Sequence, residues 1–280
     1  MQLQRLSLTI ENAIAVLRFS NPPHEYMDEH TDRDLAVALD RIESDASIRV
    51  VVLTGAGEGV FVRHYDVREL AQRGRALAAK GVKFTAERLV PENRLHACLR
   101  RIGEIPKPIL AAVNGTAMGG GFELALACDI RLVQDGPFSL GLPEINIGLL
   151  PGGGGTQRMT RLVGQAKALE LMLLGRTFSP REAVGYGLAT ECVDGVVLPR
   201  TIELATELAA KSPTALAHIK RLVRGSVAPD LAPGLALERT LFCDLMVSPD
   251  GVARMHAMNC GAVDLRDRRP GTLKGRLRED

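Results

Sequence analysis

The sequence contains no tryptophan, and aromatic residues make up only 4% of its 280 positions. The formal net charge is only +2, so the chain lacks both the basic excess and the stacking side chains of a dedicated nucleic-acid binder. The longest apolar stretch, residues 109–130, is interrupted by Asn114, Glu123 and Asp129, which would be costly in lipid. We therefore expect neither a nucleic-acid partner nor a membrane span.

Cysteine is scarce, and its spacing suggests no pairing. The five cysteines are odd in number, lie far apart and form no Cys-x-x-Cys pair, which argues against a disulfide framework or a structural zinc site. His24 and His30 are six positions apart, so they would not share a helix face as zinc ligands do. The first residues alternate as in a strand, and we see no export signal. We expect no metal and a reducing, cytoplasmic location.

Nucleotide-binding and serine-nucleophile motifs are also missing. The glycine run Gly152–Gly155 is followed by residues 156–158, Thr-Gln-Arg, instead of the Gly-Lys-Ser/Thr of a phosphate-binding loop. The run Gly119–Gly121 lacks the GxGxxG spacing of a dinucleotide site. Neither a GxSxG elbow nor an SxxK motif occurs. We therefore expect no nucleotide or redox cofactor, and a small molecule as the partner.

Apolar spacing predicts alternating strands and helices in the first two thirds of the chain. A hairpin is expected around residues 11–12, followed by short buried strands at 50–53, 109–113 and 130–133. Helical spacing occurs at 35–42, 95–102 and 122–128. After Thr156 helical patterns dominate, at 181–187, 200–211, 214–224 and 234–247. The pattern favours one α/β core with a helical C-terminal extension.

Two glutamates occur in sequence segments where an unpaired carboxylate would be unfavourable. Glu123 follows three glycines and Phe122 in an apolar run, and Glu144 follows Pro143. A carboxylate packed against protein loses hydration, which shifts its pKa unless another group compensates. Two such carboxylates facing one cavity would make an acid/base pair, whereas apart they could be a helix-terminal acid and a loop charge.

The segment from Asn114 to Ile130, read with residues 138–158 and 50–57, resembles the crotonase (enoyl-CoA hydratase/isomerase) family. The resemblance implies an α/β fold, a spiral of repeated ββα units at residues 1–200 that holds an acyl-CoA site. It also implies a helical region at residues 201–280 that packs across subunits. Members are usually trimers or dimers of trimers, so we expect a homo-oligomer.

The family's shared chemistry is stabilisation of a thioester enolate, so the resemblance implies an acyl-CoA substrate and no cofactor beyond that CoA. Gly120 and Tyr65 match the positions whose backbone N–H groups form the oxyanion hole, and Glu123 and Glu144 match the two acid/base positions of the hydratases. The leading hypothesis is hydration of a 2-enoyl-CoA, or the reverse dehydration. Isomerisation, thioester hydrolysis and retro-aldol cleavage stay open, as does a non-catalytic RNA-binding or scaffold role.

One loop departs from the family pattern. Arg63, His64 and Tyr65 precede Asp66 where small residues are usual, and the positive φ that glycine would permit at position 64 is uncommon for histidine. We therefore expect either a rebuilt loop or strain at His64, while the Tyr65 N–H can donate whatever its side chain. The large side chains suggest a non-standard acyl group. The substrate contacts implied by the resemblance are at Arg63, His64, Asp66, Arg68 and Met27.

Overall fold

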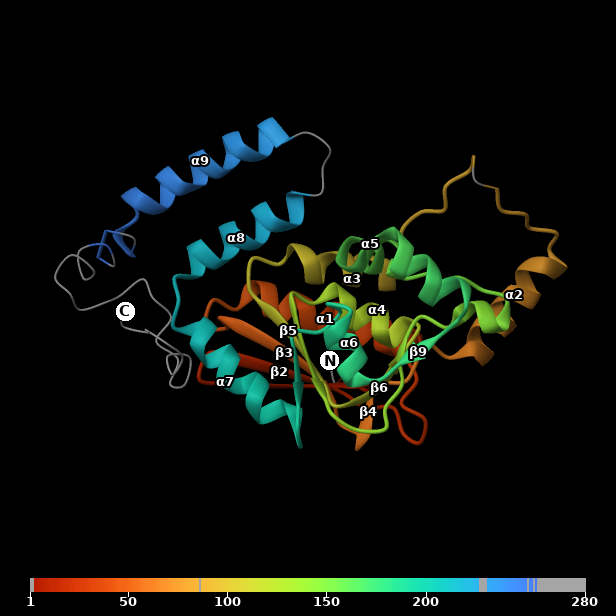
Figure 1. Cartoon of the computed structure of the whole chain (residues 1–280). Coiled ribbons are helices and arrows are strands. Elements are labelled where there is room, and N and C mark those ends of the chain that lie inside the picture. Colours follow the sequence, from red (N-terminus) through yellow and green to blue (C-terminus); the bar gives the residue numbers. More distant parts are fainter. Residues whose placement is uncertain (1–2, 86, 227–230, 251, 254, 256–280) are drawn as a thin grey trace, which may run out of the picture. The chain divides into compact units, whose positions relative to one another are not determined.

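The computed structural model describes residues 3–85, 87–226, 231–250, 252–253 and 255 (Figure 1). The chain divides into two compact units, Met1–Arg224 and Gly225–Asp280. Helix α9 (Leu231–Val247) belongs to the second unit. All the site residues predicted from the sequence lie in the first unit. In the part of the chain that the structure describes, no helix is long and apolar enough to cross a bilayer.

The first unit repeats a strand–strand–helix module. The first repeat contains β1 (Leu6–Glu11), β2 (Ile14–Phe19) and α1 (Glu29–Ser44). The second contains β3 (Val50–Gly55), β4 (Gly59–Val62) and α2 (Val67–Ala79). The third contains β5 (Ile109–Val113), β6 (Gly115–Met118) and α4 (Gly120–Ala127). A fourth begins with β7 (Ile130–Gln134) and β8 (Leu140–Gly141).

Further elements lie between and after these repeats. Helix α3 (Arg94–Glu104) precedes the third repeat, and the short 3-10 helix η1 (Glu144–Ile147) follows β8. The rest of the first unit contains α5 (Gly155–Leu173), β9 (Thr177–Phe178), α6 (Pro180–Gly185), β10 (Glu191–Val193), α7 (Val197–Ala209) and α8 (Pro213–Gly225).

The repeats distribute their strands over two sheets. From the second repeat on, the first strand joins a six-stranded sheet of order β1-β2-β3-β5-β7-β10, and the second strand joins a four-stranded sheet of order β4-β6-β8-β9. Neighbouring repeats pair in parallel, β3 with β5 and β4 with β6, which requires a crossover connection between them. This stepwise advance is a spiral of ββα units, so the predicted fold class is confirmed.

The apolar strands predicted from the sequence are buried on both faces. Val51 and Leu53 of β3 pack into the core cluster shared with α1 and α3, while Val50 and Val52 pack into a second cluster shared with α7. A strand covered on both faces needs apolar residues at successive positions rather than at alternate ones. Figure 1 shows α7 on the opposite side of the six-stranded sheet from α1 and α3.

Most of the predicted elements are present, with shifts of a few residues at their ends. The hairpin turns at Asn12 and Ala13, whose φ values of 49° and 65° match a two-residue turn of the type that joins strands tightly. The sequence pattern did not predict β4, β6 or α2. Helix α2 has no buried residue, although Val67, Leu70 and Ala71 recur at the helical spacing that a sequence pattern could have revealed.

Helix α8 is tied to the third and fourth repeats by a buried cation. The Lys220 ammonium lies 2.8 Å from the Asp129 carboxylate and donates to the carbonyl oxygens of Ile102 and Lys107. Arg224 also pairs with Asp129, at 2.9 Å. The first part of the region 201–280 therefore belongs to the first compact unit. Its proposed role in oligomerisation stays a prediction, and residues 256–280 lie outside the described part.

The start of α4 approaches β4 too closely for any side chain. A Cβ on Gly121 would lie 1.9 Å from the Val62 carbonyl oxygen, a distance that no real Cβ contact shows. We expect Gly121→Ala to lower the free energy of unfolding by about 2 kcal/mol or more, because either backbone must shift. Denaturant unfolding measures this. Gly103→Ala in α3 is the control, since nothing lies within 4 Å of its added Cβ; an equal loss in both variants would contradict the explanation.

Candidate active site

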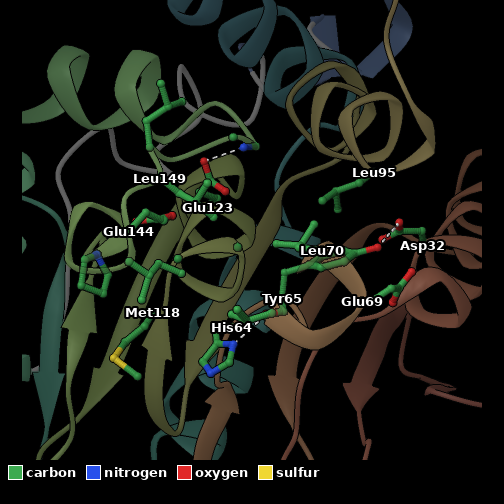
Figure 2. A pocket seen from close by; sticks show the side chains of 18 of the residues that line it. Asp32, His64, Tyr65, Glu69, Leu70, Leu95, Met118, Glu123, Glu144 and Leu149 are labelled. Carbon is green, nitrogen blue, oxygen red and sulfur yellow. Dashed lines mark hydrogen bonds between the residues drawn. The ribbon is translucent and has the colours of Figure 1, made fainter. Parts of the chain in front are cut away.

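One cavity of about 950 Å³ collects the central residues predicted from the sequence. The loop after β4 contributes His64 and Tyr65, the start of α4 contributes Gly120 and Glu123, and η1 contributes Glu144. Figure 2 shows the two glutamates on one side of this cavity and the Tyr65 side chain extending toward the other. Further lining residues come from α2, α3 and the glycine run before α5.

Two backbone N–H groups meet beside the cavity. A Cβ on Gly120 would lie 3.6 Å from the Tyr65 nitrogen, so the two backbones are in close contact. The Met27 N–H donates to the His64 carbonyl and the Asp66 N–H donates to Met27, at 2.8 Å each, which leaves the Tyr65 N–H facing the other way. Among the described residues, neither the Tyr65 nor the Gly120 N–H donates to a backbone or side-chain acceptor.

Gly119 turns the chain sharply from β6 into α4. Its φ of 49° and ψ of −128° lie in a region of backbone conformation that residues other than glycine avoid. Gly119 also has no side chain that could cap the helix. The Gly120 N–H, the first of α4, therefore lies at the positive end of the helix without a capping side chain from the described residues. An oxygen that gains negative charge between Gly120 and Tyr65 would be stabilised there.

Glu123 is held as a buried carboxylate by backbone donors. Only 3% of the residue is exposed, and its Oε1 accepts hydrogen bonds from the N–H groups of Gly153 and Gly155, both at 2.7 Å. Burial raises the pKa of Glu123, and the Gly155 and Gly153 donors and the nearby Arg158 guanidinium oppose that rise. The glycine run that is no phosphate loop thus provides these two donors.

Glu144 has a contrasting environment. Its Oε2 is buried, and no group in the described part of the chain donates a hydrogen bond to it. Its Oε1 lies 3.2 Å from where a Cβ on Gly119 would stand. Burial, aided by the negative charge of Glu123, raises the pKa of Glu144 to about 7. A carboxyl group with such a pKa is partly protonated near neutrality, so it can donate a proton.

The Tyr65 side chain is anchored at the far side of the cavity. Its hydroxyl donates to Asp32 Oδ2 at 3.1 Å, a bond visible in Figure 2. Asp32 is 8% exposed, its Oδ1 accepts no hydrogen bond, and burial raises its pKa to about 6. Burial and the Asp32 charge also raise the pKa of Tyr65, so the phenol stays protonated and remains a donor.

His64 takes an unstrained backbone conformation. The non-glycine residues with positive φ in the described part are Asn12, Ala13 and Glu25, so His64 has a negative φ and the strain considered from the sequence is absent. Its Nδ1 donates to the Tyr65 carbonyl at 2.7 Å, and its ring stacks on Tyr26 at a centroid distance of 4.3 Å. The expectation of strain at His64 is therefore wrong, and the alternative of a rebuilt loop stays a prediction.

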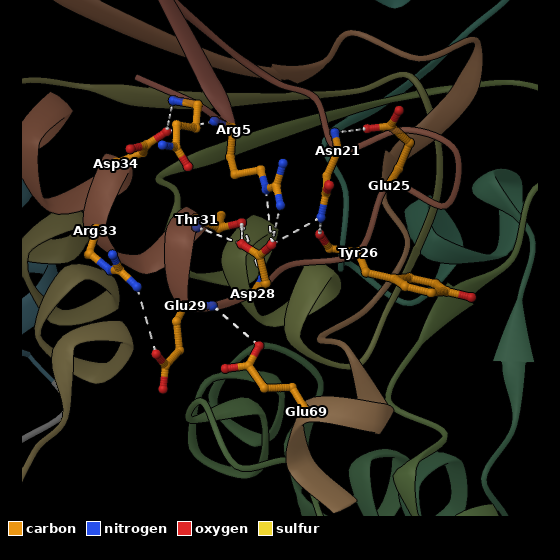
Figure 3. A network of polar contacts seen from close by, with 11 residues as sticks. Arg5, Asn21, Glu25, Tyr26, Asp28, Glu29, Thr31, Arg33, Asp34 and Glu69 are labelled. Carbon is orange, nitrogen blue, oxygen red and sulfur yellow. Dashed lines mark hydrogen bonds and ion pairs between the residues drawn. The ribbon is translucent and has the colours of Figure 1, made fainter. Parts of the chain in front are cut away.

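A polar network fixes the segment that pairs with Tyr65. Asp28 caps α1 through Thr31 and pairs with the Arg5 guanidinium at 2.9 Å (Figure 3). Asn21 donates from its side chain to the Tyr26 carbonyl at 2.7 Å and from its backbone to Glu25 at 2.7 Å. Through these bonds residues 21–28 form a rigid support behind the loop after β4.

The other predicted substrate contacts lie outside the cavity lining. Met27 is fully buried behind Gly120, and Arg63 donates to the His24 carbonyl at 3.0 Å. Asp66 caps α2 by accepting from the Arg68 N–H, and the Arg68 side chain is 78% exposed. Their contact with substrate stays a prediction. Asp32, Gly153, Gly155 and His96 were missed, and only the glycine run left a signal in the sequence.

Curated relatives and solved structures carry hydratase names. A probable enoyl-CoA hydratase of Bacillus subtilis is 34% identical over 250 residues, covering 89% of this chain and 93% of the relative. A short-chain-enoyl-CoA hydratase of Clostridium acetobutylicum is 32% identical, covering 89% and 92%. A crystal structure of an enoyl-CoA hydratase from Bacillus anthracis superposes with a TM-score of 0.81 at 29% identity, covering 92% of this chain and 97% of that one.

The family model agrees with these individual likenesses. The sequence model described as enoyl-CoA hydratase/isomerase matches residues 9–255. The chain therefore belongs to the enoyl-CoA hydratase/isomerase family of enzymes. The resemblance drawn from the sequence is thus confirmed.

The raised pKa of Glu144 predicts a pH-dependent effect on stability. Between the ordinary glutamate pKa and about 7 the folded state binds a proton that the unfolded state does not, so stability falls as the pH rises. Glu144→Gln mimics the protonated form. We expect its melting temperature to exceed that of the wild type at about pH 8 and to equal it at about pH 4. Calorimetry checks this; a constant offset at both pH values would contradict it.

Proposed function

We propose that the protein hydrates a 2-enoyl-CoA thioester or, in reverse, dehydrates a 3-hydroxyacyl-CoA. The observation that carries the proposal is the meeting, in one cavity, of two carboxylates in unlike environments and two backbone N–H groups without protein acceptors in the described part. Hydration needs these components: a base, an acid and donors for an enolate oxygen. The printed names of the relatives support the same reaction.

The thioester oxygen would accept hydrogen bonds from the N–H groups of Tyr65 and Gly120. As the enolate forms, negative charge develops on this oxygen, and donors fixed in the backbone do not need to reorganise. Each such donor is worth about 3 kcal/mol of transition-state stabilisation in comparable sites. The N-terminal end of α4 adds a favourable dipole at Gly120.

The two glutamates take different roles because their surroundings differ. Glu123, with two N–H donors on Oε1, is the stabilised carboxylate and removes a proton from water. The water oxygen then forms a bond to C3, and the C2–C3 π electrons move into the enolate. Glu144, whose pKa is raised to about 7, delivers its proton to C2 as the enolate collapses to the thioester. The net change adds one water across the double bond.

The proposal extends to the surroundings of the site. CoA enters only as part of the substrate, so no separate cofactor or metal is required by these steps. A trimer or dimer of trimers follows from the family resemblance, and a reducing, cytoplasmic location follows from the number and spacing of the cysteines; both belong to the proposal. Isomerase, hydrolase and lyase outcomes begin with the same stabilised enolate, and they differ in the product formed.

Neutral replacement of either glutamate is expected to abolish hydration without unfolding the protein. Glu123→Gln removes the base and Glu144→Gln removes the acid, so kcat should fall by about 100-fold or more in each. Loss of absorbance of the conjugated thioester measures the rate on crotonyl-CoA and longer 2-enoyl-CoAs. Glu104→Gln, an exposed change on α3, is the matched control.

Product identity separates the proposal from the related reactions. Mass spectrometry of an acyl-CoA panel should show addition of one water. An unchanged mass with a shifted double bond, or release of free CoA, would replace hydration by isomerisation or hydrolysis. Full activity in both glutamine variants on a substrate that the wild type hydrates would contradict the assigned roles.

The acid role of Glu144 also predicts the alkaline limb of the pH profile. Because Glu144 must be protonated in the free enzyme, kcat/KM should decline above about pH 7, where this carboxyl group loses its proton. Initial rates in the hydration direction at low substrate concentration, from about pH 5 to pH 9, test this. A value that stays constant up to about pH 9 would exclude Glu144 as the acid.

A further inference from the structure

The glycine loop that donates two hydrogen bonds to Glu123 is itself held by a residue of α3. His96 lines the cavity, and its Nε2 lies 2.8 Å from the Gly152 carbonyl oxygen. A carbonyl oxygen only accepts hydrogen bonds, so Nε2 carries the proton and donates. Gly152 immediately precedes Gly153, whose N–H donates to Glu123.

A second contact selects the same tautomer of His96. The Asn93 N–H points at Nδ1 across a long 3.4 Å contact, and a backbone N–H can only donate. In the neutral ring Nδ1 therefore accepts while Nε2 donates. The Asn93 side chain accepts a hydrogen bond from the His96 backbone N–H at 2.9 Å, which caps α3. This bond holds the backbone of His96, and so the point from which its side chain extends. The ring is thus oriented from both ends.

One peptide group connects His96 to Glu123. The Gly152 carbonyl and the Gly153 N–H belong to the same planar unit, so a donor to the carbonyl both orients and polarises the N–H. His96 Nε2–H thus donates to the Gly152 carbonyl oxygen, and the Gly153 N–H of the same peptide group donates to Glu123 Oε1. Figure 2 shows a backbone nitrogen donating to Glu123 at the cavity wall.

We propose that His96 is a positioning residue that keeps Glu123 ionised and aimed through the Gly152–Gly153 peptide. The inference rests on the proposed function only for the role of Glu123 as the base. Ring packing alone would not need a donor at Nε2, whereas this role does. Loss of the donor should therefore affect the carboxylate more than the fold.

Other charged groups also act on Glu123. The Arg158 guanidinium donates to the Gly153 carbonyl at 2.7 Å and to Leu99 at 3.3 Å, so it holds the next peptide of the loop. Its positive charge lowers the pKa of Glu123, while the negative charge of Glu123 raises that of Glu144. The charge of His96 itself also lowers the pKa of Glu123, and both substitutions at position 96 remove it. The comparison of the two variants with each other, which both keep Arg158, therefore isolates the peptide contact.

A matched pair of substitutions separates the donor from the ring. His96→Gln places an amide N–H near the original Nε2, whereas His96→Asn places its amide near Nδ1, where it does not reach Gly152. The carboxyl of Glu123 is titrated by carbon-13 NMR, with Glu123→Gln for assignment. In the Asn variant we expect the Glu123 pKa to rise by about half a unit to one unit, because the carboxylate loses stabilisation. In the Gln variant we expect the Glu123 pKa to lie close to the wild-type value.

Kinetics provide a second readout on the same variants. In His96→Asn, kcat should fall about tenfold with little change in KM, and the acidic limb of kcat/KM should move upward with the Glu123 pKa. His96→Gln should recover most of both. Equal titration curves in wild type and both variants, or equal shifts in both, would overturn the inference. If the wild type hydrates no acyl-CoA, the proposed function fails while the titration still decides the role of His96.

Discussion

The burial of the Glu123 carboxylate is the constraint on which the rest of the site depends. Glu123 would become protonated in such a place without compensation, because desolvation disfavours its charge. The Gly153 and Gly155 N–H groups offset part of this cost, although the pKa of Glu123 stays raised. A Cβ at Gly153 would lie 2.6 Å from Oε2 and one at Gly155 would lie 2.9 Å from Oε1, so only glycine lets this loop approach so closely.

The two carboxylates differ in their surroundings because the backbone donors of Gly153 and Gly155 bind only one of them. Glu123 receives both donors, while Glu144 keeps a buried oxygen without a partner and also experiences the negative charge of Glu123. Each interaction that keeps Glu123 ionised therefore favours the protonated form of Glu144. Two residues of one chemical type thus have different environments because the backbone around them differs. In the proposed reaction the direction of proton transfer would be set by these loops.

The residues that line the cavity at its proposed reaction centre could be identified from the sequence, whereas the residues that hold them in place could not. Glu123 and Gly120 lie in a segment with a glycine run, and Glu144 directly follows Pro143, so each can be recognised from its neighbours in the sequence. The donors to Glu123 come from positions 30 and 32 residues further along the chain, so no periodicity connects them. Strands β4 and β6 have only four residues each and pair with each other across more than fifty positions, which leaves little local pattern. Helix α2 buries nothing.

The conformation around Tyr65 explains how an unusual residue could serve at the proposed oxyanion position. The proposed donor is its backbone N–H, whose direction is set by the pairing of Met27 with the loop and not by the side chain. The phenol is then free to extend to Asp32, where its hydrogen bond fixes the same residue from the other end. The Tyr65 side chain lines the cavity, so a substitution at this position would change the shape of the cavity and leave the backbone N–H in place. In the proposed reaction it would change which acyl group fits without removing the donor to the enolate oxygen.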